Sequence, residues 1–307
     1  MIKSIIQYAK DKTRPFRRKL RAYKREFIKR YRVKKYADML FRERLGYSID
    51  WRNPKDLNEK INWLAFNTDT SEWSRLADKY LVREFVKERG CEEILIPLLG
   101  VWNNVKDINL NVLPDEFVIK TNCGSGDVVL VNKNNIDWGG VLCHLKNALE
   151  KRIGIESAEP HYLRIRQCII AEQRLSPINR GDLLDYKIWC FNGRPHLFFI
   201  CSNRDIEKRT MDISCYDLEW NRRDDYIVDK YKNDISIPKP KNLELLLEYA
   251  TILSYGFPQV RVDFYIVDDK IYFGEMTFTN GSGYERIVPD EYDFKLGKLW
   301  NIDLSKK

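Results

Sequence analysis

The stretch QVRVDFYIVDDKIYFGEMTFTNGSG, residues 259–283, decides the fold of the C-terminal part of the chain. Two runs of alternating polar and apolar residues flank residues 268–270, a pattern that predicts a β-hairpin. With a three-residue connection, Asp263 lies opposite Glu275, because successive side chains alternate between the two faces of a strand. A two-residue turn would place Gly274 opposite Asp263 and mix acidic with core residues, so we predict the three-residue connection.

The two faces of this hairpin differ in character. One face carries an apolar set that can form a core: Val262, Phe264, Ile266, Tyr272, Met276 and Phe278. On the other face Arg261 lies opposite Thr277, and two neighbouring carboxylates repel each other by about 4 kcal/mol at an intermediate effective dielectric. A magnesium ion bound by Asp263 and Glu275 would offset this repulsion, and an ion pair with Arg261 on a solvated face is the alternative. The glycines of residues 281–283 favour a site, since glycine lets backbone amides approach an anion closely.

The composition indicates an ordered globular protein without a disulfide or zinc framework. With 307 residues, 44% of them hydrophobic, the chain can bury a core as one two-lobed domain or two smaller ones. The seven cysteines are scattered without a CxxC pair, and the three histidines join no cluster with metal-ligand spacing. No apolar run has the length of a membrane span, and the N-terminus lacks the apolar stretch of a signal peptide. We therefore expect a cytoplasmic location.

Residues 1–36 form a basic arm. They hold 15 Lys or Arg and 2 Asp or Glu, a net charge of +13, whereas the remaining residues hold 38 and 43, a net charge of −5. Apolar residues recur in the arm at spacings of three and four, which predicts an amphipathic helix that Pro15 divides into two pieces. An anionic membrane surface suits such a helix best. Packing on the protein's own body or a second subunit is the main alternative, and nucleic acid is the least favoured partner because base-reading folds are absent.

The periodicity of the remaining chain predicts a mixed α+β fold. Helices are expected over Tyr36–Leu45, Leu57–Phe66, Trp73–Arg89, Trp138–Lys151, Asn242–Tyr255 and Pro289–Leu296. Strands are expected over Ile94–Trp102, Glu116–Lys120, Asp127–Asn132, Cys168–Glu172, Leu184–Phe191 and Pro195–Ser202. The segment from Cys215 to Pro240, rich in charge and proline, is expected to be an irregular connection.

A second signal is FVIKTNCGSGD, residues 117–127, which is followed by another apolar run. One strand ends at Lys120, the glycine loop Gly124-Ser125-Gly126 turns the chain, and a second strand returns. The pattern is neither a Walker A motif nor a GxGxxG fingerprint. The tip of such a hairpin can fold its amides over phosphates while Lys120 supplies positive charge. The simpler interpretation is a plain turn.

Four further charged residues have a structural as well as a functional interpretation. They are Lys79, Glu172, Asp185 and Lys187. Lys79 lies on a predicted helix upstream of the loop, and Glu172 ends a strand that runs into a linker. Asp185 and Lys187 are two residues apart on the next strand, so both point to the same side. Taken singly, they are a solvated helix charge, a strand-end acid and a surface pair. Their order along the chain is more informative.

Five segments in a fixed order carry a family resemblance. They read NPKDLNEKINWL from Asn53, ADKYLVREFV from Ala77, FVIKTNCGSG from Phe117, DYKIWCFNG from Asp185 and RVDFYIVDDKIYFGEMTFTNGSGYE from Arg261. This order resembles the ATP-grasp superfamily, and residues 53–297 resemble its teichuronopeptide-biosynthesis (TupA-like) branch. The resemblance implies an ATP-grasp fold with ATP between two α+β lobes. It divides the chain into the basic arm (1–36), a helical region (37–115), an N-terminal lobe (116–175) and a C-terminal lobe (176–307).

The resemblance also implies a role for each candidate residue. Those implied to bind ATP are Lys79, Lys120, Gly124, Ser125 and Gly126 at the phosphates, Glu172 before the linker at the adenine, and Asp185 at the ribose. Those implied in chemistry are Lys187 and Arg261 in catalysis, Asp263, Glu275 and Thr277 at Mg²⁺, and Asn280, Gly281, Ser282 and Gly283 at the acceptor substrate. Two departures stand out. Many members carry Asn where this chain has Thr277, which leaves the third metal ligand open, and residues 37–93 look helical where a parallel-sheet domain is usual.

The resulting prediction is an ATP- and Mg²⁺-dependent carboxylate–amine ligase that forms an amide through an acyl phosphate. From the resemblance, its substrates are a carboxylate of a cell-surface polysaccharide or precursor and an amine such as an amino acid. A glycosyltransferase is the enzymatic alternative, weakened by the lack of an Asp-x-Asp pair. A basic membrane- or nucleic-acid-binding module is the non-enzymatic alternative. No Ser/His/Asp constellation suggests nucleophilic catalysis.

Overall fold

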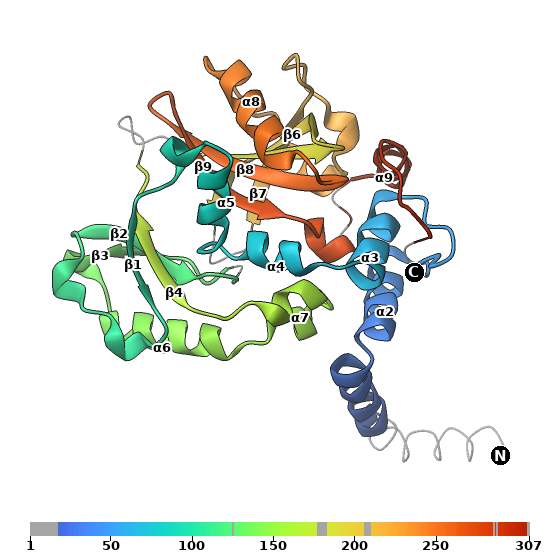
Figure 1. Cartoon of the computed structure of the whole chain (residues 1–307), viewed down its shortest axis with the longest axis horizontal. Helices are drawn as coiled ribbons and strands as arrows, with labels where there is room; N and C mark the ends of the chain where they lie inside the picture. Colours follow the sequence, from blue (N-terminus) through green and yellow to red (C-terminus); the bar gives the residue numbers. More distant parts are fainter. Residues whose placement is uncertain are drawn as a thin grey trace, which may run out of the picture.

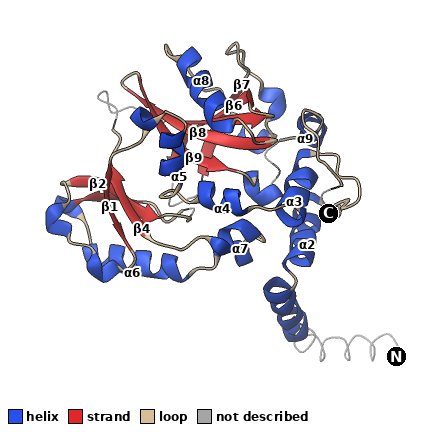
Figure 2. Ribbon diagram, in the orientation of Figure 1, coloured by secondary structure: helices blue, strands red, loops and turns tan. Residues whose placement is uncertain are grey.

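The computed structural model describes residues 18–124, 126–176, 183–205, 210–284, 286 and 288–305. Residues 1–17 of the arm and Ser125 of the glycine loop, for which we made predictions, lie outside this set. The described chain folds into two antiparallel sheets with helices around them, which confirms the predicted α+β class (Figures 1 and 2).

The segment ahead of the first sheet is helical, as the spacing of its apolar residues predicts. Its helices are α2 (Val33–Leu45), α3 (Leu57–Asn67), α4 (Ser71–Ala77) and α5 (Val82–Glu88). Asp56 caps α3, because its carboxylate accepts a hydrogen bond from the Glu59 amide at 2.7 Å. Residues 37–93 are all described and contain no strand, so the expectation of a helical region in place of a parallel sheet is confirmed.

The predicted single helix over residues 73–89 is wrong, because the chain leaves the helical path between α4 and α5. Asp78 has an extended backbone, and its Oδ1 accepts hydrogen bonds from the amides of Tyr80 at 2.8 Å and Leu81 at 3.2 Å. A side chain that caps following amides ends one helix and starts the next. Lys79 therefore lies in a break between two helices and not on a helix.

The first sheet has the strand order β1-β4-β2-β3. Its strands are β1 (Leu98–Trp102), β2 (Glu116–Thr121), β3 (Val129–Asn132) and β4 (Ile169–Gln173). The helix α6 (Trp138–Glu150) packs on this sheet, and Leu145 joins Phe117 and Ile169 in a fully buried core. Because β1 pairs with β4, the first sheet begins earlier in the chain than the boundary predicted at residue 116.

The second sheet has the order β7-β6-β5-β8-β9. Its strands are β5 (Asp185–Phe191), β6 (Arg194–Asp205), β7 (Thr210–Tyr216), β8 (Gln259–Val267) and β9 (Lys270–Thr277). The helix α8 (Leu243–Ser254) contacts β5, β6 and β8, while α4 contacts β9. The strand β7 was not predicted, and it overlaps the start of the segment expected to be irregular. The helix α9 (Asp290–Gly297) closes the fold against α3.

The hairpin of β8 and β9 has a two-residue turn, so the predicted three-residue connection is wrong. Val267 pairs with Lys270, and Asp268 and Asp269 adopt the left-handed conformation with φ of 51° and 62°. Aspartate tolerates this conformation better than most residues, and two such residues make the turn that matches the twist of paired strands.

A β-bulge at Gly274 nevertheless produces the predicted pairing. Phe264 faces Phe273, but its neighbour Asp263 faces Glu275, so one residue of β9 is extra. A Cβ at residue 274 would lie 3.0 Å from the Asp263 carbonyl oxygen, which explains glycine there. The bulge also changes the buried face, since Ile271 and Phe273 enter the core in place of the predicted Tyr272.

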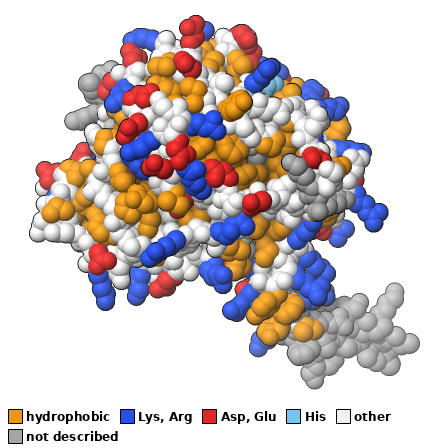
Figure 3. All heavy atoms as spheres, in the orientation of Figure 1, with side chains coloured by type: hydrophobic (Ala, Val, Ile, Leu, Met, Phe, Trp, Pro, Cys, Tyr) orange, Lys and Arg blue, Asp and Glu red, His pale blue; other side chains and the backbone are white. Residues whose placement is uncertain are grey.

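The helical residues 18–31 project from the body of the protein (Figure 1). Their inner side is attached by the buried Ile28 and by ion pairs from Arg25 to Glu43 and from Lys29 to Glu156, both 2.5 Å. Large hydrophobic side chains remain exposed on the same helix: Leu20, Tyr23, Phe27 and Tyr31. Figure 3 shows hydrophobic side chains gathered on this projecting helix beside basic ones. Within the described ranges, no helix combines the length and apolar character needed to cross a membrane.

Candidate active site

Two carboxylates meet on the polar face of β8 and β9. Asp263 and Glu275 are direct partners in the ladder, as predicted, and so are Arg261 and Thr277. Asp263 is 1% exposed, whereas the Glu275 side chain retains 35% of its accessible surface. Arg261 joins the two acids, since its guanidinium donates to both Asp263 oxygens at 2.6 and 2.7 Å and to Glu275 Oε1 at 3.1 Å. The ion pair with Arg261 that the sequence left open therefore exists, but it is buried and not solvated.

Lys187 is held between two acids. Its Nζ lies 2.6 Å from Asp185 Oδ2 and 2.6 Å from Asp263 Oδ2. The predicted common orientation of Asp185 and Lys187 is confirmed, and Asp263 arrives from β8 because it pairs with Lys187 in the ladder. Burial opposes the charge of Lys187, but the two carboxylates outweigh burial and raise the pKa of its ammonium. Lys187 thus stays cationic although most of its side chain is shielded from solvent.

Lys79 reaches the same acids from the break between α4 and α5. Its Nζ lies 3.3 Å from Glu275 Oε2 and donates to the Gly124 carbonyl at 3.2 Å. Desolvation disfavours the charged form of Glu275, yet Lys79, Lys187 and Arg261 together lower the pKa of its carboxyl. The Lys79 amide also donates to the Asn122 carbonyl at 2.8 Å. One residue therefore connects the glycine loop of the first sheet with the acids of the second.

The base of the glycine loop is fixed by Asp127. Its Oδ2 accepts hydrogen bonds from the Thr121 amide at 2.9 Å and from the Thr121 hydroxyl, whose oxygen accepts from the Gly124 amide at 3.0 Å. A Cβ on Gly124 would lie 2.4 Å from the Asp127 carboxylate, and Gly126 has a φ of 82°. Both glycines are thus required by the loop geometry. Their contact with phosphates stays a prediction.

Lys120 and Glu172 form a second charged group on the first sheet. Lys120 Nζ lies 2.6 Å from Glu172 Oε2, and Arg83 of α5 lies 3.2 Å from Glu172 Oε1. Glu172 is buried, so these two cations offset its charge. We did not predict Arg83. Its position four residues after Lys79, in the motif ADKYLVREFV, is the signal that could have identified it.

The segment after β9 forms a tight left-handed turn, η8 (Asn280–Gly283). Gly281, Ser282 and Gly283 have φ of 53°, 58° and 72°, a conformation that costs a non-glycine residue such as Ser282 about 1–2 kcal/mol. The Ser282 hydroxyl donates to Glu159 Oε2 at 3.1 Å, and the Thr279 hydroxyl donates to Glu159 Oε1. Burial raises the pKa of Glu159, against the effect of these hydroxyl donors. No pattern in the sequence indicated Glu159.

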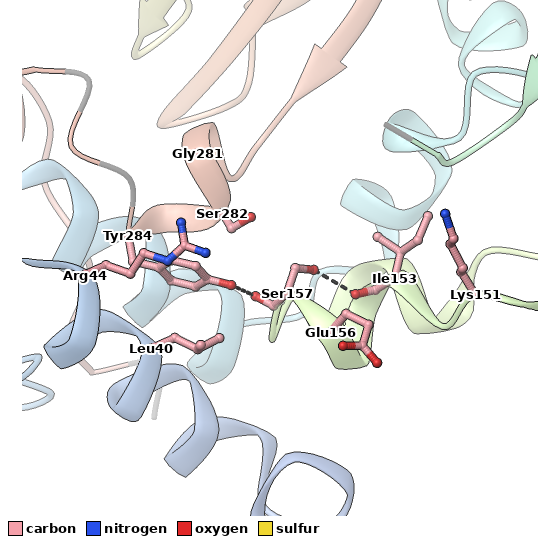
Figure 4. A pocket seen from close by; sticks show the side chains of 9 residues that line it. All are labelled: Leu40, Arg44, Lys151, Ile153, Glu156, Ser157, Gly281, Ser282 and Tyr284. Atoms are coloured by element: carbon pink, nitrogen blue, oxygen red, sulfur yellow. Dashed lines mark hydrogen bonds between the residues drawn. The ribbon is translucent and has the colours of Figure 1, made fainter. Parts of the chain in front are cut away.

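A cavity of about 300 Å³ adjoins this turn (Figure 4). Its lining comes from α2, from the turn η8 and from the segment around α7 (Ile153–Glu156). The lining residues are Leu40, Arg44, Lys151, Ile153, Glu156, Ser157, Gly281, Ser282 and Tyr284. Two residues predicted to face the acceptor substrate, Gly281 and Ser282, therefore line a real cavity. The buried Asn280 and Gly283 are not part of its lining.

The donor atoms on the polar face fit a hard divalent cation. The Asp263 and Glu275 carboxylates lie beside the Thr277 hydroxyl, which donates to Glu275 Oε1 at 3.2 Å. Mg²⁺ prefers such oxygen ligands and takes others from water and phosphate. The part of the chain that the structure describes contains no group of three or more His, Cys, Asp and Glu residues placed to hold a metal. The two carboxylates and the hydroxyl can thus supply part of the ligand set of such an ion.

The chain was compared with protein families and with solved structures. The family described as TupA-like ATPgrasp matches residues 59–301. Solved structures that match parts of the chain include D-alanine–D-alanine ligase from Bacillus anthracis complexed with ATP, with 16% identity over 69% of this chain and 56% of that chain and a TM-score of 0.39. L-amino acid ligase from Bacillus licheniformis is 13% identical over 81% of this chain and 56% of that chain, with a TM-score of 0.47. D-alanine–D-alanine ligase from Helicobacter pylori is 15% identical over 80% of this chain and 65% of that chain, with a TM-score of 0.42.

The present chain spans 56% to 65% of the length of these three proteins. A comparison of the sequence with curated proteins gives no match. The family match covers most of the chain and includes both sheets, the glycine loop and the paired acids. The chain therefore belongs to the TupA-like ATP-grasp family.

Proposed function

We propose that the protein is an ATP- and Mg²⁺-dependent ligase that joins a carboxylate to an amine. The observation that carries the proposal is the arrangement of Lys79, Lys187 and Arg261 around Asp263 and Glu275, next to the glycine loop. Phosphoryl transfer requires positive charge around the migrating phosphate and little covalent chemistry from the protein. This group of three cations and two acids, partly shielded from solvent, supplies that environment.

In the proposed reaction, a substrate carboxylate oxygen attacks the γ-phosphorus of ATP. The bond to the bridging oxygen breaks, which gives an acyl phosphate and ADP. The amine nitrogen then attacks the acyl carbon, the carbon–oxygen bond to phosphate breaks, and the products are an amide, inorganic phosphate and a proton. No nucleophilic side chain is needed for either step.

Each residue of the site has a proposed part in this reaction. Lys120 and Lys79 bind phosphates below the glycine loop, and Lys187 holds the γ-phosphate and then the acyl phosphate. Arg261 keeps the two carboxylates oriented through its hydrogen bonds to both. When bound, Mg²⁺ would be held by Asp263, Glu275 and Thr277, and it would neutralise charge on the phosphate oxygens. The proposed contact of Asp185 is with the ribose, and the linker after Glu172 is proposed to contact the adenine.

We further propose that the carboxylate belongs to a cell-surface polysaccharide or its precursor and that the amine is an amino acid. Support comes from the TupA-like family assignment. The test is ADP release by the full chain with ATP, Mg²⁺, amino acids and acidic sugars, compared with nucleoside diphosphate release from nucleotide sugars. Release from nucleotide sugars without ATP would favour a glycosyltransferase. Mass spectrometry of the surface glycan from a strain lacking the protein should show the loss of an amino acid residue.

A second proposal concerns the basic arm, which we place on the inner face of the cell membrane. Leu20, Tyr23, Phe27 and Tyr31 are 50% to 77% exposed, while Ile28 on the inner side packs on the body. The described part of the aromatic stripe is therefore available to a partner, which speaks against packing on the protein's own body. An apolar stripe beside many Lys and Arg residues suits an anionic lipid surface. Such binding would place the ligase beside lipid-linked glycan intermediates.

A further inference from the structure

The cavity beside the turn η8 has a surplus of positive charge. Three charged side chains line it, namely Arg44, Lys151 and Glu156. Glu156 is neutralised by Lys29 at 2.5 Å. Among the described residues, no acidic side chain lies within ion-pair distance of Arg44 or Lys151. An unpaired cation at the edge of a cavity attracts an anionic ligand.

The remaining walls give the cavity a defined shape. The Tyr284 hydroxyl donates to the Ser157 carbonyl, and the Ser157 hydroxyl donates to the Ile153 carbonyl at 2.8 Å, so the two sides of the cavity are connected (Figure 4). Tyr284 is buried and lies below the Arg44 guanidinium, 5.9 Å from the ring centre. Arg44 approaches from α2, whereas Lys151 approaches from the opposite side (Figure 4). The volume of about 300 Å³ matches the lower end of small-molecule sites.

The cavity lies close to the proposed reaction centre. Three residues lie between Thr277 at the end of β9 and Gly281 in the cavity wall, which limits the distance between their Cα atoms to about 14 Å. A ligand with the length of a sugar derivative can therefore occupy the cavity and extend toward the acids.

We propose that this cavity binds an anionic group of the acceptor substrate, a carboxylate or a phosphate carried by a sugar, through Arg44 and Lys151. The proposal rests on the ligase function proposed above. The anion bound here is distinct from the reacting group, which extends toward Glu275. A neutral sugar of the same size lacks the charge that the two cations recognise, so it binds weakly.

The test is a binding titration of the full chain, without nucleotide, by isothermal calorimetry. The probes are glucuronate and glucose 6-phosphate, with glucose as the neutral probe. The variants are Arg44→Gln and Lys151→Gln, and the control is Arg42→Gln, an exposed arginine of α2 that does not line the cavity. Each cavity variant should weaken binding of the anionic sugar about tenfold or more, because a charge-assisted hydrogen bond is lost. The control should bind like the wild type.

The outcomes separate this proposal from the ligase function. The proposal is supported if the wild type binds either anionic sugar and both cavity variants weaken that binding. The anionic sugar that binds more tightly shows whether the cavity prefers a carboxylate or a phosphate. Equal binding of glucose, absence of binding to the wild type, or binding unchanged by both variants overturns it. A parallel ADP titration tests the nucleotide site. If the wild type does not bind ADP, the result counts against the ligase function and not against the anion site.

Discussion

Lys187 and Asp263 are direct partners in the β5–β8 ladder, and their charged atoms lie 2.6 Å apart. Both side chains are shielded from solvent, and the arginine that also binds Asp263 is equally shielded. Replacing one member of such a buried group leaves the other charges without a partner, which typically costs about 3–5 kcal/mol. Effects on stability and on activity must therefore be separated in every variant of this site.

The first prediction concerns the two acids. Glu275→Gln should reduce the rate of ATP-dependent ADP release about 10²-fold or more, because the neutral amide of glutamine cannot hold Mg²⁺. The loss of stability should be small, because Glu275 is partly exposed. Asp263→Asn should lose activity and also stability. Activity at saturating Mg²⁺ and urea unfolding measure the two effects. Asp269→Asn at the tip of the same hairpin is the matched control, and near-normal rates in both site variants would refute the metal assignment.

The second prediction compares two lysines. Lys120→Met should weaken nucleotide binding about tenfold and leave the fold intact, because Arg83 still pairs with Glu172. Lys187→Met should reduce turnover and lower stability, since it leaves Asp185 and Asp263 with less positive charge. Calorimetric ADP titration and thermal unfolding distinguish the variants. Lys146→Met, which alters an exposed lysine on α6, should change neither property, and unaltered ADP binding by Lys120→Met would contradict its assignment to phosphate.

The third prediction concerns the glycine loop, residues 124–126. Its amides should exchange hydrogen more slowly when ATP and Mg²⁺ are bound, because a phosphate lid gains hydrogen-bond acceptors and loses access to water. Hydrogen exchange followed by mass spectrometry measures this directly. The tip of the β8–β9 hairpin, at Asp268 and Asp269, serves as the internal reference. Equal protection of the loop with and without nucleotide would count against a phosphate lid.

The fourth prediction concerns acid stability. His161 is fully buried, neither ring nitrogen has a hydrogen-bond partner among the described residues, and burial with the nearby Arg164 lowers its pKa from 6.5 to about 3. The unfolded chain binds a proton at this residue below pH 6.5 and the folded chain does not. Stability should therefore be retained above pH 6.5 and fall by up to about 1.4 kcal/mol per pH unit as the pH decreases toward 3.

Urea unfolding at several pH values measures this dependence. His161→Phe should flatten it, because phenylalanine cannot bind a proton and preserves the edge-to-face contact with Trp73. His144→Gln, at an exposed position of α6, should keep the wild-type dependence. An unchanged slope in His161→Phe would show that other groups dominate the acid unfolding.

The fifth prediction concerns the arm. The full chain should sediment with anionic but not with neutral vesicles, and high salt should abolish the association. Tyr23→Ser combined with Phe27→Ser should remove most binding and keep the ion pairs of Arg25 and Lys29 with the body. Tyr255→Ser, which alters an exposed aromatic residue after α8, is the control. If a chain without residues 1–36 sediments equally well, the arm is not the anchor, and loss of a dimer in the double variant would indicate a second copy as the partner.

The sequence predicted the parts of the fold that depend on local periodicity. The two runs around the turn predicted β8 and β9, and the pairing of Asp263 with Glu275 followed from their alternation. The turn length was wrong because a bulge shifts the register by one residue at Gly274, and alternation alone cannot distinguish a longer turn from a bulge. The break after α4 was missed because Asp78 fits a helical pattern, although its side chain caps the next turn.

The candidate site was less predictable, because its residues come from elements distant in sequence. Glu159 lies more than a hundred residues from Thr279 and Ser282, from whose hydroxyls it accepts hydrogen bonds. Arg83 approaches Glu172 across a similar separation. Such contacts depend on the packing of α5 and the segment before β4 and leave no periodic signal. The motif order nevertheless indicated the family, which the match over residues 59–301 confirms.

The position of Lys79 has a mechanical consequence. Its amide donates a hydrogen bond to Asn122, directly after β2 of the first sheet, and its ammonium contacts Glu275 on the second, so Lys79 connects the two sheets. Any rotation that separates the sheets must lengthen that 3.3 Å contact, and transfer of the ammonium to another anion would remove the restraint. The position of the first sheet relative to the second is thus linked to the charge that surrounds Glu275.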